Sequence, residues 1–546
     1  MSAITPQTEL RLIKCPIESD NRNQMTFASA SAQYNYFNSL PHITADNFTY
    51  QRKDNVIRYP AHIDSIMGYN YVMYQNEAYT NKWFYAFITN MEYINDNMTL
   101  ITIHTDVYQT WMFQMVWKKS FVEREHVNDD TIGLHTIPEN LETGEYINMM
   151  SFDSNDLGSC HIVMGSTISP VDGTTTKTGN TYGGIFSGVS YFIFQNDSAL
   201  NQALFRIADN GNSDSIVSLF YAPDWLTDYT HATWGDGVAE VDISSGQQKA
   251  TGIAIPLTLS KIGGVGDEGY TFKNNKLCTF PYVAYMVSNN AGESVTYHLE
   301  DFYDDGTHTA GLEVWGALTP GCSIRLVPEY YKTKNPNYNE QYNNEYGLNA
   351  PKLPICSWGN DTYTNWLTQN GINFFGTKMN YSEWSTIGAS IGGVTSMLSA
   401  FGQNGDVGSA AISGLTTGFT GIFNAMQQEY QHSFNSVVAQ GNVNSGDVTF
   451  ASGKSKFSCF LMSIKPEYAK IIDNYFSMYG YKINDVKIPN ITGRTNWNYV
   501  KTIGANIEGD IPENHLNEIK SIFNNGVTLW HNSSTYLDYS QSNAIV

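Results

Sequence analysis

One segment of the 546-residue chain constrains its fold more than any other, because it carries almost no charge. Within Ser385–Gln428 the one charged side chain is Asp406. Asp406 ends a turn at residues 402–406, which divides the segment into apolar arms at 387–401 and 407–426. As helices the arms would be about 22 and about 30 Å long, and about 30 Å matches a bilayer core. An uncharged segment of this kind must be shielded from water, either inside protein or in a membrane.

Both arms combine small residues with large apolar ones. Gly388 and Gly392, like Gly414 and Gly418, stand four positions apart, a spacing that lets helices approach closely in lipid. The large apolar residues are more numerous than a linker would carry: Ile387, Ile391, Val394, Met397, Leu398, Phe401, Ile412, Leu415, Phe419, Ile422 and Phe423. Because Gly, Ser and Thr are also frequent, the residues alone leave three readings open: a flexible surface loop, a buried hairpin, or a hairpin that enters a membrane on demand.

The rest of the chain has the composition of a mainly β protein. Charged residues make up only 15%, whereas the chain contains 36 Tyr, which favours strands, and 45 Gly, which favours turns. Trp83–Ile88 is rich in aromatic and branched residues, and apolar and polar residues alternate in Thr99–His104. The turn Asn95–Asn97 separates these runs, so we predict a half-buried β-hairpin. Residues 155–320 contain short apolar runs divided by Gly, Asn and Asp, which predicts further strands.

Helices are expected to be few and to lie late in the chain. Pro466 fits the first position of a helix, and Gly480 is suited to cap its end. A second helix is predicted to begin at Pro512 and to stop before Gly526. The expected fold class is therefore mainly β with a few helices, a β-rich α+β protein.

Charge and cysteine content exclude several functions. The net charge of −22 argues against sequence-specific nucleic-acid binding, which needs Lys and Arg on phosphates. The six cysteines lie far apart and form no zinc-binding pattern, so we expect reduced, mostly buried thiols and no bound cofactor. The N-terminus lacks the basic and apolar regions of a signal peptide. The cysteines are Cys15, Cys160, Cys278, Cys322, Cys356 and Cys459.

Two segments have the residue pattern of an enzyme motif but lack the neighbouring structure that the motif needs. Gly264–Gly269 fits a dinucleotide-binding pattern without a helix behind it, and Gly388–Gly392 fits a nucleophile elbow without a base in reach. His104 and Asp106 are predicted to share a strand face, where a structural histidine is favoured over a metal ligand. Ser120–His126 contains two glutamates that fit glycosidase chemistry, although a solvated or inter-subunit strand is the favoured interpretation. We therefore predict neither catalytic nor metal-binding residues.

Several separated stretches resemble one protein family. The chain is similar to the tail-knob, or distal tail-tube, proteins of small short-tailed DNA phages that infect Gram-positive bacteria. The similar stretches occur in the expected order and cover about a third of the chain: Thr105–Trp111, Ser120–His126, Asp130–His135, Pro354–Trp358, Asp361–Leu367, Lys465–Tyr468, Tyr475–Tyr481, Lys487–Asn490 and Asn496–Lys501.

The resemblance implies a structural virion protein rather than an enzyme. It implies a homohexameric tube of β-barrel-like domains at the distal end of the short tail, made in the host cytoplasm. The expected partners are an upstream tail or collar tube protein, a tail-tip protein, genomic DNA that passes without sequence-specific binding, and the host cytoplasmic membrane. The segment Ser385–Gln428 stands where the family's apolar loop would stand, with Asp406 at its turn.

The resemblance and the sequence patterns together divide the chain into five expected parts. These are an N-terminal tube part at 1–154, an outer β-rich insertion at 155–320, a second tube part at 321–384, the apolar membrane-active loop at 385–450, and a C-terminal tube part with two helices at 451–546. Two alternative functions remain, a tail-tip hydrolase of cell-wall polymer and a carbohydrate-binding adsorption protein. The acidic composition suits a DNA conduit, because a negative wall repels phosphate.

Overall fold

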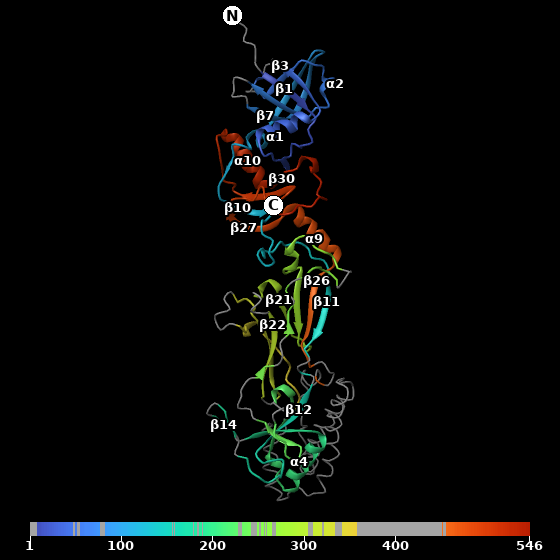
Figure 1. Cartoon of the computed structure of the whole chain (residues 1–546), viewed down its shortest axis with the longest axis vertical. Helices are drawn as coiled ribbons and strands as arrows, with labels where there is room; N and C mark the ends of the chain where they lie inside the picture. The colour runs from blue at the N-terminus through green and yellow to red at the C-terminus, as the bar shows by residue number, and fades with distance from the viewer. Residues whose placement is uncertain are drawn as a thin grey trace, which may run out of the picture. The chain divides into compact units, whose positions relative to one another are not determined.

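Strands are the commonest elements of the computed structural model (Figure 1), which confirms the mainly β fold class. The structure describes residues 8–46, 50–51, 55–76, 82–154, 157, 159–177, 180–182, 185–187, 189–227, 232–241, 248–249, 253–255, 257, 259–264, 269–303, 310–318, 321–333, 341–356, 450 and 455–546. The chain divides into two units, each built from separated segments. Unit 1 comprises Met1–Glu145, Tyr270–Pro281 and Lys465–Val546, and unit 2 comprises Tyr146–Gly269 and Tyr282–Ile464.

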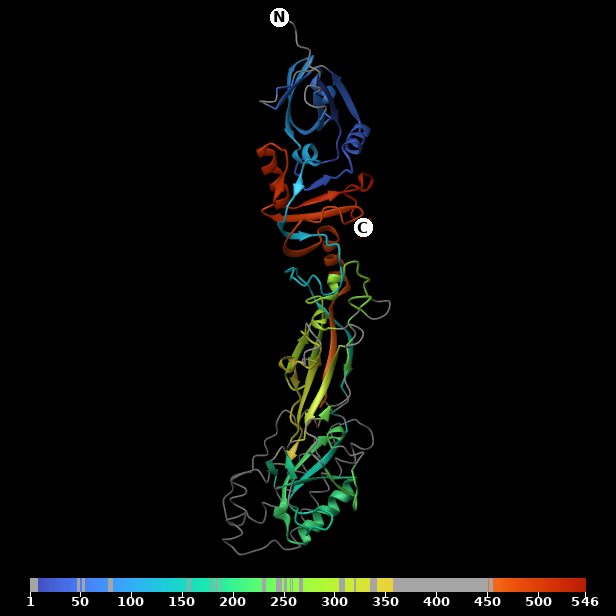
Figure 2. The same ribbon diagram turned by 60° about the vertical axis from the view of Figure 1, so that its left-hand side comes forward.

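The N-terminal part of unit 1 is a curled seven-stranded sheet (Figure 2). Its order is β3 (His42–Asp46), β1 (Thr8–Ile13), β6 (Tyr71–Asn76), β7 (Trp83–Asn95), β8 (Met98–Thr105), β5 (Val56–Tyr59) and β4 (Tyr50–Gln51). β7 and β8 pair antiparallel around residues 96–97, which confirms the predicted hairpin. Leu10, Leu12, Val72 and Ile101 are fully buried in the core of this sheet.

A second sheet of unit 1 joins both ends of the chain. Its order is β2 (Asn23–Met25), β30 (Val527–Trp530), β28 (Trp497–Ile503), β10 (Ser120–Glu125) and β27 (Tyr481–Lys487). A small sheet pairs β9 (Val116–Trp117) with β29 (Ile507–Glu508). The β2–β30 pair is parallel, whereas β10 lies antiparallel between β28 and β27. Strand β10 is therefore an interior strand of this sheet.

Both predicted C-terminal helices are confirmed. Helix α9 (Pro466–Tyr479) begins with Pro466 and is capped by Gly480. Helix α10 (Glu513–Asn525) begins one residue after Pro512 and ends at Gly526. One face of α10 buries Ile519, Ile522 and Phe523 in a cluster that also holds Val500, Val527 and Leu529. The apolar spacing and the terminal Pro and Gly residues account for both helices.

The described residues of unit 2 form four further sheets. The first contains β11 (Tyr146–Asp153), β26 (Ser458–Ile464), β20 (Val283–Ser288) and β21 (Ser294–Tyr297). The second contains β17 (Val238–Val241), β15 (Ser190–Phe194), β12 (Cys160–Ser166), β16 (Ile216–Pro223) and β25 (Ile355–Cys356). The third contains β18 (Gln248–Lys249), β22 (Gly311–Ala317), β23 (Ser323–Glu329) and β24 (Leu348–Asn349), with β19 (Ile253–Ala254) beside β22, and the fourth pairs β13 (Asn180–Tyr182) with β14 (Ile185–Ser187).

The prediction that helices lie late in the chain is wrong. Unit 1 also contains α1 (Ala30–Ser39), α2 (Ile63–Ile66) and α3 (Val107–Trp111), and unit 2 contains α4 (Asp197–Asp209). Helix α1 buries only Gln33 and Phe37, so its sequence shows little helical periodicity. Helix α4 has a wider apolar face and an Asn196 cap that accepts from the amide of Ala199, but it lies among strand-like runs. Both helices begin after a capping side chain, Ser29 for α1.

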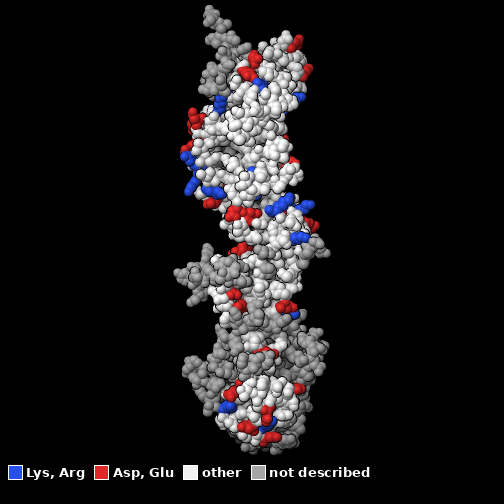
Figure 3. Space-filling view, in the orientation of Figure 1, with Lys and Arg blue, Asp and Glu red and all other residues white. Residues whose placement is uncertain are grey.

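The expected membrane-active residues lie outside the described residues. All the residues proposed for the two arms, together with Asp406, fall in the range 357–449, which the structure does not describe. Among the helices that it does describe, none has the length and apolar character needed to cross a bilayer. On the face of unit 1 seen in Figure 3, uncharged residues cover most of the surface, as the low charge content predicts.

The backbone at Gly480 generates a prediction about stability. Gly480 has φ 65° and ψ −155°, a conformation that side-chain-bearing residues avoid, and a Cβ there would overlap the carbonyl of Glu125. We expect Gly480→Ala to destabilise unit 1 by the cost of the backbone conformation, about 1–3 kcal/mol, plus that of the overlap. Chemical unfolding followed by tryptophan fluorescence measures the loss.

Gly504 provides a matched control. It also has a positive φ of 71°, but a Cβ there meets no atom within 4 Å. Gly504→Ala is therefore expected to cost only about 1–2 kcal/mol for the left-handed backbone. Equal losses for the two variants would contradict the close approach of Gly480 to Glu125.

Candidate functional site

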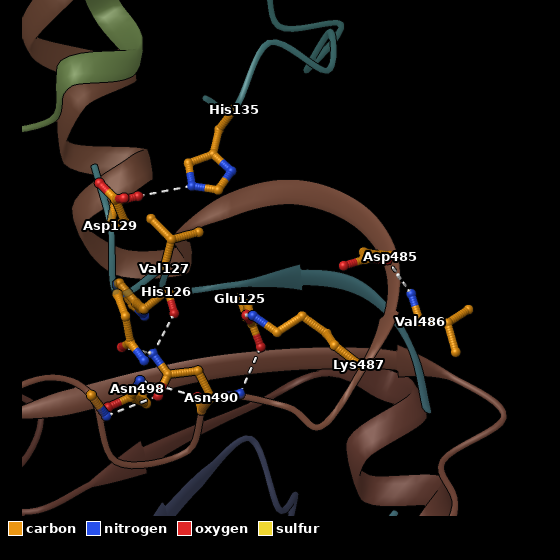
Figure 4. A network of polar contacts seen from close by, with 12 residues as sticks. Glu125, His126, Val127, Asp129, His135, Asp485, Val486, Lys487, Asn490 and Asn498 are labelled. Atoms are coloured by element: carbon orange, nitrogen blue, oxygen red, sulfur yellow. Dashed lines mark hydrogen bonds and ion pairs between the residues drawn. The ribbon is translucent and has the colours of Figure 1, made fainter. Parts of the chain in front are cut away.

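The described residues bring several of the family-like stretches together in unit 1. Strands β10, β27 and β28, helix α9 and the segment 270–281 meet around a buried polar network (Figure 4). Buried charges and amides are costly unless they are paired, so their concentration here marks the network as the candidate functional site. The network lies within unit 1 and uses residues from all three segments of that unit.

Glu125, at the end of β10, is completely buried. Its carboxylate accepts a hydrogen bond from Lys487 Nζ at 2.6 Å and another from the backbone N of Asn490 at 2.7 Å. Glu123 pairs separately with Lys501, with a distance of 2.9 Å between Nζ and Oε2. The expectation of a solvated strand is wrong for Glu125, which is buried, while an inter-subunit contact of this strand stays a prediction. Each carboxylate is neutralised by a lysine, which leaves neither placed as a free acid or base.

His126 connects β28 to α9 through both nitrogens of its ring. Nδ1 accepts a hydrogen bond from the backbone N of Tyr499 at 2.8 Å, and Nε2 lies 3.1 Å from the carbonyl O of Ser477. These partners require the neutral ring with its proton on Nε2. Burial, followed by the charge of Arg494, lowers the pKa of His126 to about 3. The histidine therefore stays neutral in the folded protein at neutral pH.

Two asparagines hold the loop between β27 and β28. Asn490 donates from Nδ2 to the carbonyl O of His126 at 2.7 Å and to Oδ1 of Asn128 at 2.5 Å, and its Oδ1 accepts from the N of Gly493. Asn498, fully buried on β28, donates from Nδ2 to the carbonyl O of Asn490 at 3.1 Å. The asparagine side chains thus satisfy backbone groups that no strand neighbour reaches.

Glu139 is the centre of a buried ionic cluster. Its carboxylate pairs with Arg124 of β10 and with Lys276, and it accepts a hydrogen bond from the backbone N of Lys482 at 2.9 Å. Arg124 also donates to the carbonyl O of Gly480 at 2.7 Å. Burial lowers the pKa of Lys276, while the charge of Glu139 opposes that shift. The sequence analysis missed Glu139, because it stands in a loop-like stretch with no signal of burial.

The segment 270–281 is attached to α9 by a second buried carboxylate. Asp473 of α9 accepts hydrogen bonds from Tyr270 Oη at 2.9 Å, from the N of Lys273 at 2.7 Å and from Nδ2 of Asn274 at 2.7 Å. Asp130 accepts from Tyr481 Oη at 2.6 Å and from the N of Asn275. Unit 1 therefore includes a segment of the region 155–320 that carries no recognisable motif.

The candidate metal ligands lie apart. His104 on β8 is exposed and lies 2.7 Å from Glu518 Oε1. Asp106 follows β8, is buried, and caps α3 by accepting from the N of Gln109 at 3.1 Å; burial raises its pKa to about 6. The predicted shared strand face is therefore wrong. In the part of the chain that the structure describes, His, Cys, Asp and Glu form no group of three able to hold a metal ion.

The arrangement has the character of a structural joint. Four carboxylates each accept a hydrogen bond from a segment of unit 1 other than their own. They belong to Glu125, Glu139, Asp130 and Asp473. The side chains of five of the six cysteines are described, and all five are free thiols, as expected. Burial raises the pKa of Cys15, Cys278, Cys322 and Cys459 to about 12, which makes them unreactive near neutral pH.

The ionic cluster predicts an unequal response to the loss of two glutamates. Glu139→Ala leaves Arg124 and Lys276 buried without their carboxylate, which is expected to cost about 3–5 kcal/mol of unfolding free energy. Glu145 makes an exposed pair with Lys465, so Glu145→Ala is expected to change stability little. Urea unfolding of both variants provides the comparison. A loss for Glu139→Ala no larger than that for Glu145→Ala would be inconsistent with a buried cluster that stabilises unit 1.

Two protein families match the chain. The family described as the C-terminal domain of the tail knob protein gp9 of Bacillus phage phi29 matches residues 244–544. The family described as the N-terminus of the caudoviral major tail protein matches residues 6–118. The first match includes β27, β28 and α9 of the polar network, and the second covers the seven-stranded sheet.

Individual relatives and a solved structure agree with these matches. The tail knob protein gp9 of Bacillus phage PZA is 27% identical over 96% of this chain and 96% of its own length, as is that of phi29; gp9 of Bacillus phage B103 is 24% identical over 98% of each. The structure of the bacteriophage C1 tail knob protein gp12 aligns with a TM-score of 0.57 at 15% identity over 99% of this chain and 100% of that one, which shows a shared fold. Because the gp9 family match covers more than half of the chain, the chain belongs to the phage tail knob protein family represented by gp9 of Bacillus phage phi29.

Proposed function

We propose that this structural tail knob protein forms a hexameric tube that conducts the genome during ejection and carries an apolar loop into the host membrane. The main support for this proposal is the nearly uncharged segment Ser385–Gln428. It lies in a chain that is similar to tail knob proteins over almost its whole length. Upstream, the tube joins a tail or collar tube protein, and at its tip it joins a tail-tip protein. The role is structural rather than catalytic.

Charge supports the conduit part of this proposal. Each chain has a net charge of −22, so an assembly of several copies surrounds its channel with a negative field. A wall with more carboxylates than amines repels phosphate and lets DNA slide without being bound. The same composition disfavours sequence-specific contacts, for which Lys and Arg on phosphates are needed.

The segment Ser385–Gln428 supports the membrane part. Six copies would expose many large apolar side chains, so the loops must be stored inside the closed tube before ejection. Asp406 stands at the turn, where it can remain in the headgroup region or in an aqueous pore. Gly388/Gly392 and Gly414/Gly418 allow neighbouring hairpins to pack closely and to share the cost of insertion.

The tube generates a prediction about mass. The purified chain is expected to assemble into particles of six times 61.1 kDa, measured by mass photometry. A monomer that binds cell-wall glycan would instead favour an adsorption protein. Clearing of purified cell wall by the isolated protein would favour a hydrolase.

The loop generates a prediction about membrane leakage. Particles with released loops, or a peptide of residues 385–428, are expected to release dye from liposomes. Leu415→Asp with Phe419→Asp is expected to abolish release while hexamers still form, because a charge in the second arm opposes insertion. The control pair Leu415→Met with Phe419→Leu keeps the arm apolar and should retain release. Intact liposomes with the unaltered loop at both acidic and neutral pH would refute the membrane role.

A further inference from the structure

His126 is held by two partners that require opposite roles of its ring nitrogens. Nδ1 must accept, because its partner at 2.8 Å is the backbone N–H of Tyr499 on β28. Nε2 must donate, because its partner at 3.1 Å is the carbonyl O of Ser477 on α9. The same carbonyl accepts from Trp497 Nε1 at 3.0 Å, so it has a second donor. The ring is 2% exposed, which leaves almost no water to replace either partner.

We propose that His126 is an acid-sensitive clasp, which releases the Tyr499 amide of β28 when the ring is protonated and keeps its bond to α9. The proposal concerns unit 1 alone and holds whether or not the loop enters a membrane. It adds a response to acid that neither the assembly nor the ejection role requires.

Protonation changes the two contacts differently. A proton on Nδ1 would face the Tyr499 N–H, so two donors would meet at a distance where one acceptor is needed. The ring or the strand must then move apart. Nε2 keeps its proton, and Ser477 lies in the last turn of α9, where a positive charge is favoured by the helix dipole. The contact with β28 is therefore the one that breaks.

The surrounding charges oppose the protonated ring. Arg494 from the loop before β28, Arg124 from β10 and His531 after β30 all disfavour a positive charge on His126. Glu125, which precedes His126 at the end of β10, bonds to Lys487 and to the backbone N of Asn490 instead. The α9 side contributes the carbonyl of Ser477 as the acceptor of the ring proton. The groups around the closed clasp therefore do little to stabilise the protonated ring of His126.

The pH range of the clasp follows from the pKa of His126 in the two states. Burial lowers it from 6.5 to about 3 in the closed state, and an opened, hydrated ring returns towards 6.5. Between these values the open state binds a proton that the closed state does not, so acid favours opening. By linkage, the opening equilibrium at Tyr499 is expected to grow about tenfold for each pH unit below 6.5.

Residue-resolved hydrogen exchange of the full chain tests this clasp. Exchange is followed from pH 6.5 to 3.5, and each rate is divided by the intrinsic rate of an unprotected amide at that pH. Protection of the Tyr499 amide is expected to fall about tenfold per pH unit, while the amides of Val500, Lys501 and Thr502 on the same strand change less. Parallel behaviour of all four amides would overturn the proposal.

Two variants separate the roles of the ring nitrogens. His126→Asn places an uncharged acceptor near Nδ1, so Tyr499 protection should persist and lose its dependence on pH. His126→Gln supplies a donor near Nε2 without that acceptor, so Tyr499 should be poorly protected at every pH. An acid-dependent loss in His126→Asn equal to that of the natural protein would also overturn the proposal. Where a variant does not fold, the measurement on the natural chain decides alone.

Discussion

The joint between the three segments of unit 1 depends on the buried carboxylate of Glu139. It accepts from Arg124 on β10, from Lys276 in the segment 270–281 and from the backbone of Lys482 on β27. Removing such charges from water costs several kcal/mol per ion, and only a complete set of partners offsets that cost. Because each partner comes from a different stretch of the chain, we infer that the cluster selects one arrangement of these stretches. Apolar side chains of similar volume would hold them together without that selectivity.

Neutral amides have a comparable role elsewhere in unit 1, in keeping with the low charge content of the chain. Asn490 and Asn498 satisfy the backbone around β28, while Gln109 on α3 donates to the carbonyl O of Met25 at 2.8 Å and accepts from Gln33 at 2.9 Å. An amide both donates and accepts, so it can bridge backbone groups without the desolvation cost of an ion. His126 also bridges two backbone groups through a neutral ring, but unlike the amides it can be protonated.

Local patterns predicted the elements whose signals lie close together in the chain. The β7–β8 hairpin follows from two strand-like runs and a turn, and α9 and α10 follow from apolar spacing with Pro and Gly at their ends. Helix α1 was missed because its buried face is only two residues wide.

The site was less predictable, because burial is set by neighbours that are distant in sequence. The sequence of Ser120–His126 indicated a solvated or inter-subunit strand, yet Glu125 contacts the loop before β28 and His126 contacts α9. Glu139 lies between Pro138 and Asn140, where the residues alone indicate a surface loop. The family resemblance marked Ser120–His126 and Lys487–Asn490 as important stretches, but only the fold shows that they contact each other.

The parallel pairing of β2 with β30 has a consequence for the order of synthesis. Asn23 pairs with Thr528 and Met25 with Trp530. Strand β2 therefore cannot form this pair until the ribosome has made β30. At about 5–20 residues per second, that interval is roughly 25–100 s on the ribosome. Unit 2 ends at Ile464, so all of its residues are made before the last segment of unit 1, Lys465–Val546. A chain that terminates between β28 and β30 would contain all of unit 2 but would leave the β28 edge that pairs with β30 unpaired, and an unpaired strand edge is a template for aggregation.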